Sequence, residues 1–249
     1  MMLRPFFPLA TIMLTMLFAL PASTRPFVDL PRDPDSWSNF DYIDKLQSEG
    51  FIEGFPDNTF SGGRYVTRYE MVTVVSRIVD RLLSEMSETD PAVAEVEQAT
   101  ATGPTEMSFT DVPPDHWAYQ DVKKLENLGL LIGYPDARFD GDRRITKFEF
   151  AVILNRLCQR LPRWFDENGY DSTSDLTAQP YSDLTENHWA YRDIMSLKRL
   201  GFIVGYPDGT IKGNRLFTRW EMAMVIARSY DRLSSPLIEE RWRMHSSGG

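Results

Sequence analysis

Hydrophobic residues along this chain recur at helical spacing in two kinds of segment that alternate. One kind is amphipathic: in residues 118–128 the apolar side chains recur at intervals of four, three and three residues, and residues 190–200 repeat those intervals. This spacing places them on one face of a helix. The other kind is apolar on most sides, as in residues 148–157. A helix of that kind is expected at the centre of a structure.

A loop between the two kinds of segment occurs three times. Each copy begins with Pro-Asp and ends with Thr, a basic residue, an aromatic residue and Glu, and the proline and the glutamate are 14 residues apart in every copy. A spacing held three times indicates one repeated structural unit. Each unit is expected to run helix, glycine stop, turn, loop, helix. The stops are Gly50, Gly129 and Gly201, because a left-handed glycine commonly closes the last helical turn.

This pattern divides the chain into three units and their connections. The three apolar helices, one from each unit, suggest a shared central bundle. The segment after the first unit is acidic, rich in Ser, Thr and Ala, and lacks an apolar face, which is typical of a flexible linker. The expected units are residues 27–83, 109–161 and 181–233, with linkers at 84–108 and 162–180 and a tail at 234–249.

The first 22 residues read as a secretory signal peptide. Arg4 precedes an almost wholly apolar run that ends at Leu20, and the small residues Ala22 and Ser23 follow. A positive start, a short apolar stretch and small residues at its end are typical of a cleaved signal. The alternative is a retained N-terminal anchor, although the stretch is shorter than the roughly 20 residues that span a bilayer.

Both helices of each unit carry capping signals. The second helix begins at Thr-x-x-Glu, a capping box in which each of the two side chains accepts a hydrogen bond from the other residue's backbone N–H. The three boxes are Thr67 with Glu70, Thr146 with Glu149 and Thr218 with Glu221. The first helix is expected to start at a Trp with an N-cap residue two positions before it. These pairs are Asp35 with Trp37, Asp115 with Trp117 and Asn187 with Trp189.

A basic residue follows the Thr of each box: Arg68, Lys147 and Arg219. A cation is unfavourable at the positive end of the helix dipole. An anion bound there, held by the cation and by free backbone N–H groups, would explain it. The alternative is a salt bridge to a carboxylate of another unit.

Aromatic residues near both helix starts could stack on sugar rings or pack in the core. For Trp37, Trp117 and Trp189 core packing is the favoured interpretation. For the aromatic residues that follow the basic position both interpretations stay open; they are Tyr69, Phe148 and Trp220.

Composition and motifs exclude other classes of function. The net charge is −9, whereas a nucleic-acid binder shows a basic face. A single cysteine, Cys158, permits no internal disulfide and is expected to be buried. The Asp-rich loop from Asp136 fails as a calcium loop, because Arg138 and Lys147 occupy ligand positions. No nucleophile elbow, phosphate loop or His-metal spacing is present. We therefore expect no enzyme activity, no metal and no cofactor.

The repeated motifs resemble the S-layer homology domain family, in its usual tandem of three. The resemblance covers about residues 27–233. It rests on Phe-x-Asp at the unit starts, Trp-Ala-Tyr at 117–119 and 189–191, Gly-Tyr-Pro-Asp at 133–136 and 205–208, and the Thr-Arg-x-Glu box. It implies a mainly α fold, in which three tandem helix-loop-helix repeats form a pseudo-threefold spindle around a central three-helix bundle.

The resemblance also implies a ligand site. In the family, grooves between units bind a cell-wall polysaccharide non-covalently, often through a pyruvate ketal whose carboxylate meets the basic residue of the box. By position, Arg68, Lys147 and Arg219 take that role, and the groove glycines are Gly54, Gly133 and Gly205. The aromatic version of the box resembles copies in diderm and cyanobacterial envelope proteins, where the ligand is a peptidoglycan-linked polymer. Lys147 cannot make the bidentate contact of an arginine, so its groove is expected to be weak or empty.

We therefore expect a secreted, non-catalytic protein of the cell envelope, located at the cell wall, the S-layer or in the periplasm. It would hold itself, or an envelope protein cargo that the sequence does not identify, on a wall polysaccharide or peptidoglycan-linked polymer. We expect no nucleic acid partner and no membrane span after signal cleavage. The alternative is a scaffold or adaptor that binds another protein through the same grooves. A third class, a wall-active enzyme, would need a pair of carboxylates in a cleft.

Overall fold

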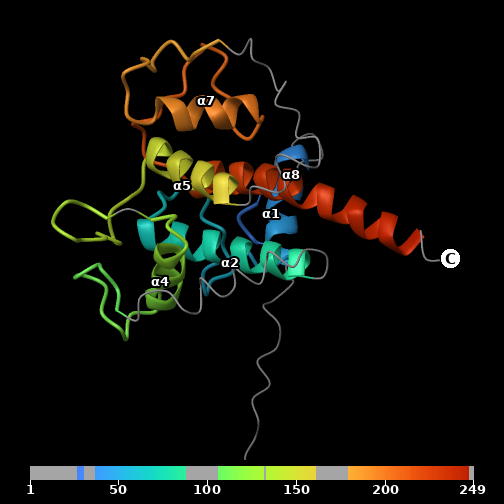
Figure 1. The fold of residues 1–249 in the computed structure, drawn as a ribbon, viewed down its shortest axis with the longest axis horizontal. Helices are drawn as coiled ribbons and strands as arrows, with labels where there is room; N and C mark the ends of the chain where they lie inside the picture. The colour runs from blue at the N-terminus through green and yellow to red at the C-terminus, as the bar shows by residue number, and fades with distance from the viewer. Residues whose placement is uncertain (1–26, 31–36, 88–105, 132, 161–178, 247–249) are drawn as a thin grey trace, which may run out of the picture.

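The computed structural model describes residues 27–30, 37–87, 106–131, 133–160 and 179–246, and within these ranges it contains helices and no strand. The expected signal peptide, most of both linkers and the N-cap residue Asp35 lie outside them. The fold is mainly α, as predicted. Its helices are α1 (Trp37–Ser48), α2 (Arg68–Ser87), α4 (Tyr119–Asn127), α5 (Lys147–Arg160), α7 (Tyr191–Arg199) and α8 (Arg219–Ser246) (Figure 1).

The helices of the three repeats pack on one another in a cyclic order. The first helix of a repeat packs on the second helix of the preceding repeat: α4 lies against α2, α7 against α5, and α1 against α8 (Figure 1). Helix α2 also contacts α8. Each amphipathic helix therefore buries its apolar face on a neighbouring repeat. The full spindle with a central bundle of three helices stays a prediction.

A ring of backbone hydrogen bonds joins the loops just before the second helices. The Val66 N–H donates to the Phe217 carbonyl, the Phe217 N–H to the Ile145 carbonyl, and the Ile145 N–H to the Val66 carbonyl, with N to O distances of 2.9, 2.9 and 3.0 Å. These three residues hold equivalent positions in the three repeats. The three bonds form a closed cycle, so the N–H and the carbonyl of each of these residues are hydrogen-bonded to the other two loops.

The start of the first helix differs from the expectation in the second and third repeats. Helix α4 begins at Tyr119, and the N-cap position is Ala118 instead of Asp115. A turn precedes it, in which the Tyr119 N–H donates to the His116 carbonyl. The Nδ1 atom of His116 accepts the Ala118 N–H at 3.2 Å. The third repeat does the same with His188 and Ala190. The histidine side chain thus accepts a hydrogen bond from an amide near the helix start, a capping role that we had expected of the preceding Asp115 or Asn187.

Helix ends follow the glycine prediction. Gly129 has a φ of 67°, its N–H donates to Glu126, and the next N–H, of Leu130, donates to Leu125. This pair of bonds is the Schellman motif. Gly50 and Gly201 close α1 and α7 with φ of 75° and 68°.

An aspartate near the start of each repeat holds the loop that follows. The carboxylate of Asp111 accepts the N–H groups of Phe139 and Asp140, both at 2.7 Å. Asp29 and Asp183 accept the equivalent pairs of N–H groups in the other repeats. The second residue of each pair has a positive φ, which is 55° at Asp140. The carboxylate therefore stabilises a turn that a non-glycine residue rarely adopts.

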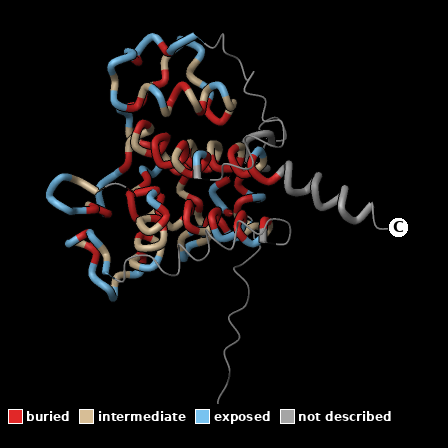
Figure 2. Tube along the Cα trace, viewed as in Figure 1, coloured by how far each residue is buried: buried red, intermediate tan, exposed pale blue. Residues whose placement is uncertain are grey.

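Most of the buried residues lie in the helices. Buried positions line the inward faces of α2, α5 and α8, while the loops carry most of the exposed positions (Figure 2). Cys158 is buried as expected, and burial raises the pKa of its thiol. Helix α8 continues past Leu233 to Ser246, so most of the expected tail is helical.

Candidate functional site

The three boxes form the same hydrogen bonds. At the start of α5, Oε2 of Glu149 accepts the Thr146 N–H at 2.9 Å, and Oγ1 of Thr146 accepts the Glu149 N–H at 3.3 Å. The first and third repeats repeat both bonds through Thr67 with Glu70 and Thr218 with Glu221. The box residues are thus helix caps in this structure.

The backbone amides of the first two residues of α2, α5 and α8 are not free to bind a ligand. The Lys147 N–H donates to the Arg215 carbonyl and the Phe148 N–H to the Gly213 carbonyl, both in the next repeat. The N–H groups of Arg68, Tyr69, Arg219 and Trp220 are bound in the same way. The expectation of free N–H groups is therefore wrong. Sequence reasoning missed the cause, since the carbonyl groups come from a neighbouring repeat.

Arg68 and Arg219 lie inside the interfaces between repeats. Arg219 is 8% exposed, and its guanidinium donates to the backbone carbonyls of Phe60 and Glu53, both at 2.9 Å. Arg68 is 5% exposed and donates to the Phe139 carbonyl at 2.8 Å. Its Nη1 lies 3.8 Å from Glu149, the box glutamate of the next repeat. The salt bridge to another unit, which the sequence left open as the alternative, is thus present at Arg68.

The aromatic residues of the boxes also contact the next repeat. The rings of Tyr69, Phe148 and Trp220 lie close to Gly141, Gly213 and Gly62, where a side chain could not fit. Tyr69 and Phe148 are 5% and 2% exposed, and they face His116 and His188 with ring centroids 4.1 and 4.4 Å apart. In this structure these rings are interface residues, whereas Trp220 is only partly buried.

The tryptophans ahead of the first helices are not core residues where they are described. Trp117 and Trp189 are 63% and 61% exposed, so the core-packing interpretation is wrong for both. Trp117 lies 5.9 Å from Tyr69, and Trp189 lies 6.1 Å from Phe148, between ring centroids. Each covers the edge of a contact between repeats. The side chain of Trp37 lies outside the described residues.

The glycines assigned to the grooves have a packing role. A Cβ at Gly133 would lie 2.3 Å from the ring of Phe109 and 2.9 Å from the Arg138 carbonyl. Gly54 and Gly205 meet Phe27 and Tyr181 in the same way. The aromatic residue that opens each repeat therefore requires the absence of a side chain at these positions. Of the three, Gly205 also lines a cavity.

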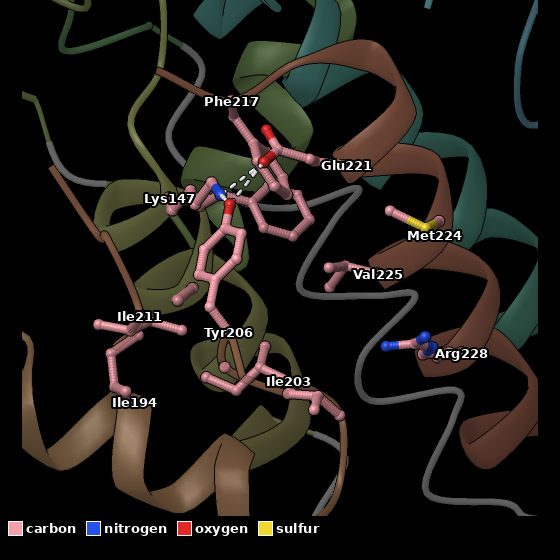
Figure 3. A pocket seen from close by; sticks show the side chains of 14 residues that line it. Lys147, Ile194, Ile203, Tyr206, Ile211, Phe217, Glu221, Met224, Val225 and Arg228 are labelled. Atoms are coloured by element: carbon pink, nitrogen blue, oxygen red, sulfur yellow. Dashed lines mark hydrogen bonds and ion pairs between the residues drawn. The ribbon is translucent and has the colours of Figure 1, made fainter. Parts of the chain in front are cut away.

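That cavity lies between the second and third repeats and has a volume of about 200 Å³ (Figure 3). Lys147 stands at one end, where its ammonium contacts the Tyr206 hydroxyl and lies 2.5 Å from Glu221. Arg228 lines the cavity farther along α8. Its other walls are mainly apolar: Phe150, Ala151, Ile194, Ile203, Val204, Ile211, Phe217, Met224 and Val225. This cavity thus lies in the groove that we expected to be weak or empty. A more open depression of about 450 Å³ is lined by Tyr134, Pro135, Asp136, Arg138, Asp140 and Arg143 of the second repeat.

Two residue differences explain why this groove is open. In the other two grooves an arginine of one repeat stacks on a phenylalanine of the next: Arg68 lies 4.7 Å from the Phe139 ring and Arg219 lies 5.0 Å from the Phe60 ring. The equivalent residues here are Lys147 and Ile211. Both are smaller, and both line the cavity. The sequence signal for this groove is the pair of Lys147 and Ile211 at positions that hold Arg and Phe in the other two repeats.

The ion pair at Lys147 is stabilised by hydrogen bonds. The Tyr206 hydroxyl donates to Oε1 of Glu221 at 3.0 Å, and the Thr218 N–H donates to Oε2 at 3.1 Å. Burial acts to raise the pKa of Glu221, but the hydrogen bonds from Lys147 and Thr218 hold that pKa below its ordinary value. Glu221 is therefore charged at neutral pH and balances the charge of Lys147.

The described part of the chain contains neither a metal-site cluster nor a helix that could span a membrane. No cluster of three or more His, Cys, Asp or Glu side chains there has the arrangement of a metal site. Among the same residues, no helix combines the length and the apolar character needed to cross a membrane.

The family model of the S-layer homology domain matches residues 26–72, 108–151 and 180–223. Three matches cover more than half of the chain, and they coincide with the three repeats described above. The chain belongs to the S-layer homology domain family. The repeats thus support attachment at the cell envelope, in agreement with the expectation from the sequence.

Curated relatives fit this assignment. Cell surface glycoprotein 1 of Acetivibrio thermocellus is 28% identical over 190 residues, which are 75% of this chain and 7% of the relative. The cellulosome-anchoring protein of the same organism is 28% identical over 182 residues, 73% of this chain and 36% of the relative. Outer membrane protein alpha of Thermotoga maritima is 39% identical over 115 residues, 46% of this chain and 28% of the relative. The chain thus spans only a minor part of each of these relatives.

Proposed function

We propose that this chain attaches to the cell envelope by binding an anionic wall polysaccharide, or a peptidoglycan-linked polymer, in the groove between its second and third repeats. The observation that carries the proposal is the cavity of about 200 Å³ between α5 and α8. It is far larger than the roughly 30 Å³ that one water molecule takes in the liquid. A substituent of a sugar, such as a pyruvate ketal, is of suitable size.

The composition of the groove suits a sugar with a charged substituent. Lys147, Tyr206 and Arg228 supply polar contacts, and the apolar walls can cover the hydrocarbon face of a ring or a methyl group. Pockets of this kind, apolar with a few placed polar groups, are typical of small-ligand sites. In this proposal Arg68 and Arg219 hold the repeats together, and the third groove carries the ligand.

The role proposed for the chain is binding without catalysis. The names of the relatives point the same way, since they include a cellulosome-anchoring protein and a cell surface glycoprotein. A cargo held at the envelope would join through a part of the protein other than this groove.

The test replaces two residues that line the cavity by the residues that occupy the same positions in the other two grooves. The double variant Lys147→Arg with Ile211→Phe installs the residues that the other two grooves carry, so it should fill the cavity and preserve the fold. We expect it to lose co-sedimentation with purified wall sacculi while its unfolding midpoint stays close to that of the unchanged chain. Lys198→Arg is the control, because Lys198 lies outside the groove.

Two results would oppose the proposal. Full binding by the double variant would remove the groove from the ligand site. Binding that persists on sacculi stripped of their polymer by acid would favour the adaptor function, in which the ligand is a protein.

A further inference from the structure

Arg228 has counterparts in the other two repeats. It lies on α8, seven residues after the box glutamate Glu221, and Arg77 and Arg156 lie seven residues after Glu70 and Glu149. The three arginines therefore share one helical position. The sequence reasoning assigned a role to none of them.

The counterparts are occupied by internal partners. Nη2 of Arg77 lies 2.6 Å from the carboxylate of Glu53, and its Nη1 donates to the Gly50 carbonyl at 3.4 Å. Arg156 donates to the Leu130 carbonyl at 3.4 Å. Arg228 is half-buried, and within the part of the chain that the structure describes it forms no hydrogen bond or ion pair.

One difference in sequence separates the first repeat from the third in this respect. Glu53 directly precedes Gly54 in the first repeat, and Val204 precedes Gly205 in the third. A valine cannot pair with the arginine. Val204 and Arg228 both line the cavity, so the missing carboxylate leaves the guanidinium beside open space.

The charges of the grooves differ for the same reason. In the first repeat, Arg77 pairs with Glu53 at 2.6 Å, and Glu70 pairs with Arg64 at 3.0 Å. In the groove between the second and third repeats, Lys147 and Glu221 balance each other at 2.5 Å. Arg228 remains as one uncompensated positive charge among the residues that line the cavity. Such a charge, half-buried and beside apolar walls, attracts an anion more strongly than an exposed one.

We propose that Arg228, and not the box residue Lys147, binds the anionic group of the ligand. The ligand class is a saccharide that carries a carboxylate or a phosphate, with an apolar part that contacts Ile203, Met224 and Val225. A guanidinium suits this role, because its planar set of donors binds either anion through two hydrogen bonds. This inference rests on the proposed function, since it names the residue that recognises the ligand in that groove.

Two variants of the full chain test the inference with sacculi as the probe. Arg228→Gln removes the charge, and Val204→Glu gives Arg228 the internal partner that Arg77 has. We expect each to weaken binding by about tenfold or more, the effect of losing one charge-assisted contact. Arg77→Gln is the matched control and should bind like the unchanged chain.

Treated sacculi identify the anion. Reduction with carbodiimide and borohydride converts the carboxylates of acidic sugars into neutral alcohols, and hydrogen fluoride cleaves phosphodiesters. Loss of binding after one treatment assigns the corresponding group to Arg228, provided that the loss is smaller for Arg228→Gln. Undiminished binding after both treatments would overturn the inference.

The outcomes separate this inference from the proposed function. If Lys147→Arg with Ile211→Phe abolishes binding while Arg228→Gln and Val204→Glu bind normally, the groove is the site and the role of Arg228 is refuted. If all of these variants bind normally, the proposed function fails as well. Unfolding curves and circular dichroism show that each variant is folded, and Val204→Glu provides a second test if Arg228→Gln is unstable.

Discussion

Tyr69 of the first repeat packs directly on Gly141 of the second, and a Cβ atom at Gly141 would lie 2.1 Å from the ring. The Tyr69 N–H also donates to the Gly141 carbonyl at 2.9 Å. Phe148 with Gly213 and Trp220 with Gly62 repeat this contact. The glycine is thus required by an aromatic ring of the neighbouring repeat, and the contact fixes how closely two repeats approach.

Replacing Gly141 by Ala should weaken the interface between the first and second repeats. The new methyl group overlaps the ring of Tyr69, which is 5% exposed and cannot move freely. We expect the free energy of unfolding to fall by about 1–3 kcal/mol, the usual cost of overpacking. Urea unfolding followed by circular dichroism measures it. At Gly63 a Cβ would meet nothing within 4 Å, so Gly63→Ala is the control and an equal loss there would refute the explanation.

Asp111→Ala should destabilise the second repeat. The substitution removes the acceptor for the Phe139 and Asp140 N–H groups. Two hydrogen bonds to a charged acceptor, at about 1.5 kcal/mol each, give an expected loss of about 3 kcal/mol. Thermal unfolding at neutral pH tests the value against Asp115→Ala, an exposed position. A loss below that of the control would show that the loop does not need the carboxylate.

Much of the fold could be predicted because its signals are local. The glycine stop at Gly129 and the capping box at Thr146 involve residues a few positions apart, and their side-chain chemistry determines the backbone. The predicted start of the first helix was wrong in the second repeat, because the Ala118 N–H is bound by His116, a residue with no strong capping preference. A capping rule based on residue type assigned that role to Asp115.

The candidate site was harder to predict, because it depends on contacts between repeats. The basic residues were placed correctly at the helix starts, but the partner of Arg219 is the Phe60 carbonyl, 159 positions away along the chain. Lys147 was expected to bind an anion less well than the two arginines. Its side chain is smaller than theirs, and together with Ile211 it lines the cavity. Sequence reasoning about a single residue cannot give the volume left between two repeats.

Arg219→Ala is expected mainly to lower the stability of the fold, with any effect on binding following from that loss. The guanidinium is 8% exposed and donates to the carbonyls of Phe60 and Glu53. Its loss leaves both carbonyls without these donors, so we expect the free energy of unfolding to fall by about 3 kcal/mol. Chemical denaturation with Arg215→Ala as an exposed control measures it. A stable Arg219→Ala variant that no longer binds sacculi would instead place the ligand at Arg219.

The ion pair of Lys147 and Glu221 should make the interface between the second and third repeats sensitive to acid. The pKa of Glu221 is lower in the folded chain than in the unfolded chain, where a glutamate titrates near 4.3. The unfolded state therefore takes up a proton first as the pH falls. The contribution of Glu221 is fully present above about pH 4.3 and is lost as the pH falls through the lowered pKa of the folded state.

Glu221→Gln should remove this part of the pH dependence. At neutral pH the variant lacks the charge that faces Lys147, so it should be less stable than the unchanged chain. As the pH falls through the lowered pKa of Glu221 in the folded chain, the difference between the two should shrink. Unfolding midpoints measured from pH 7 to pH 3 test this, with Glu186→Gln as a control at an exposed position. A difference that stays constant across this range would show that the Lys147 contact does not depend on the charge of Glu221.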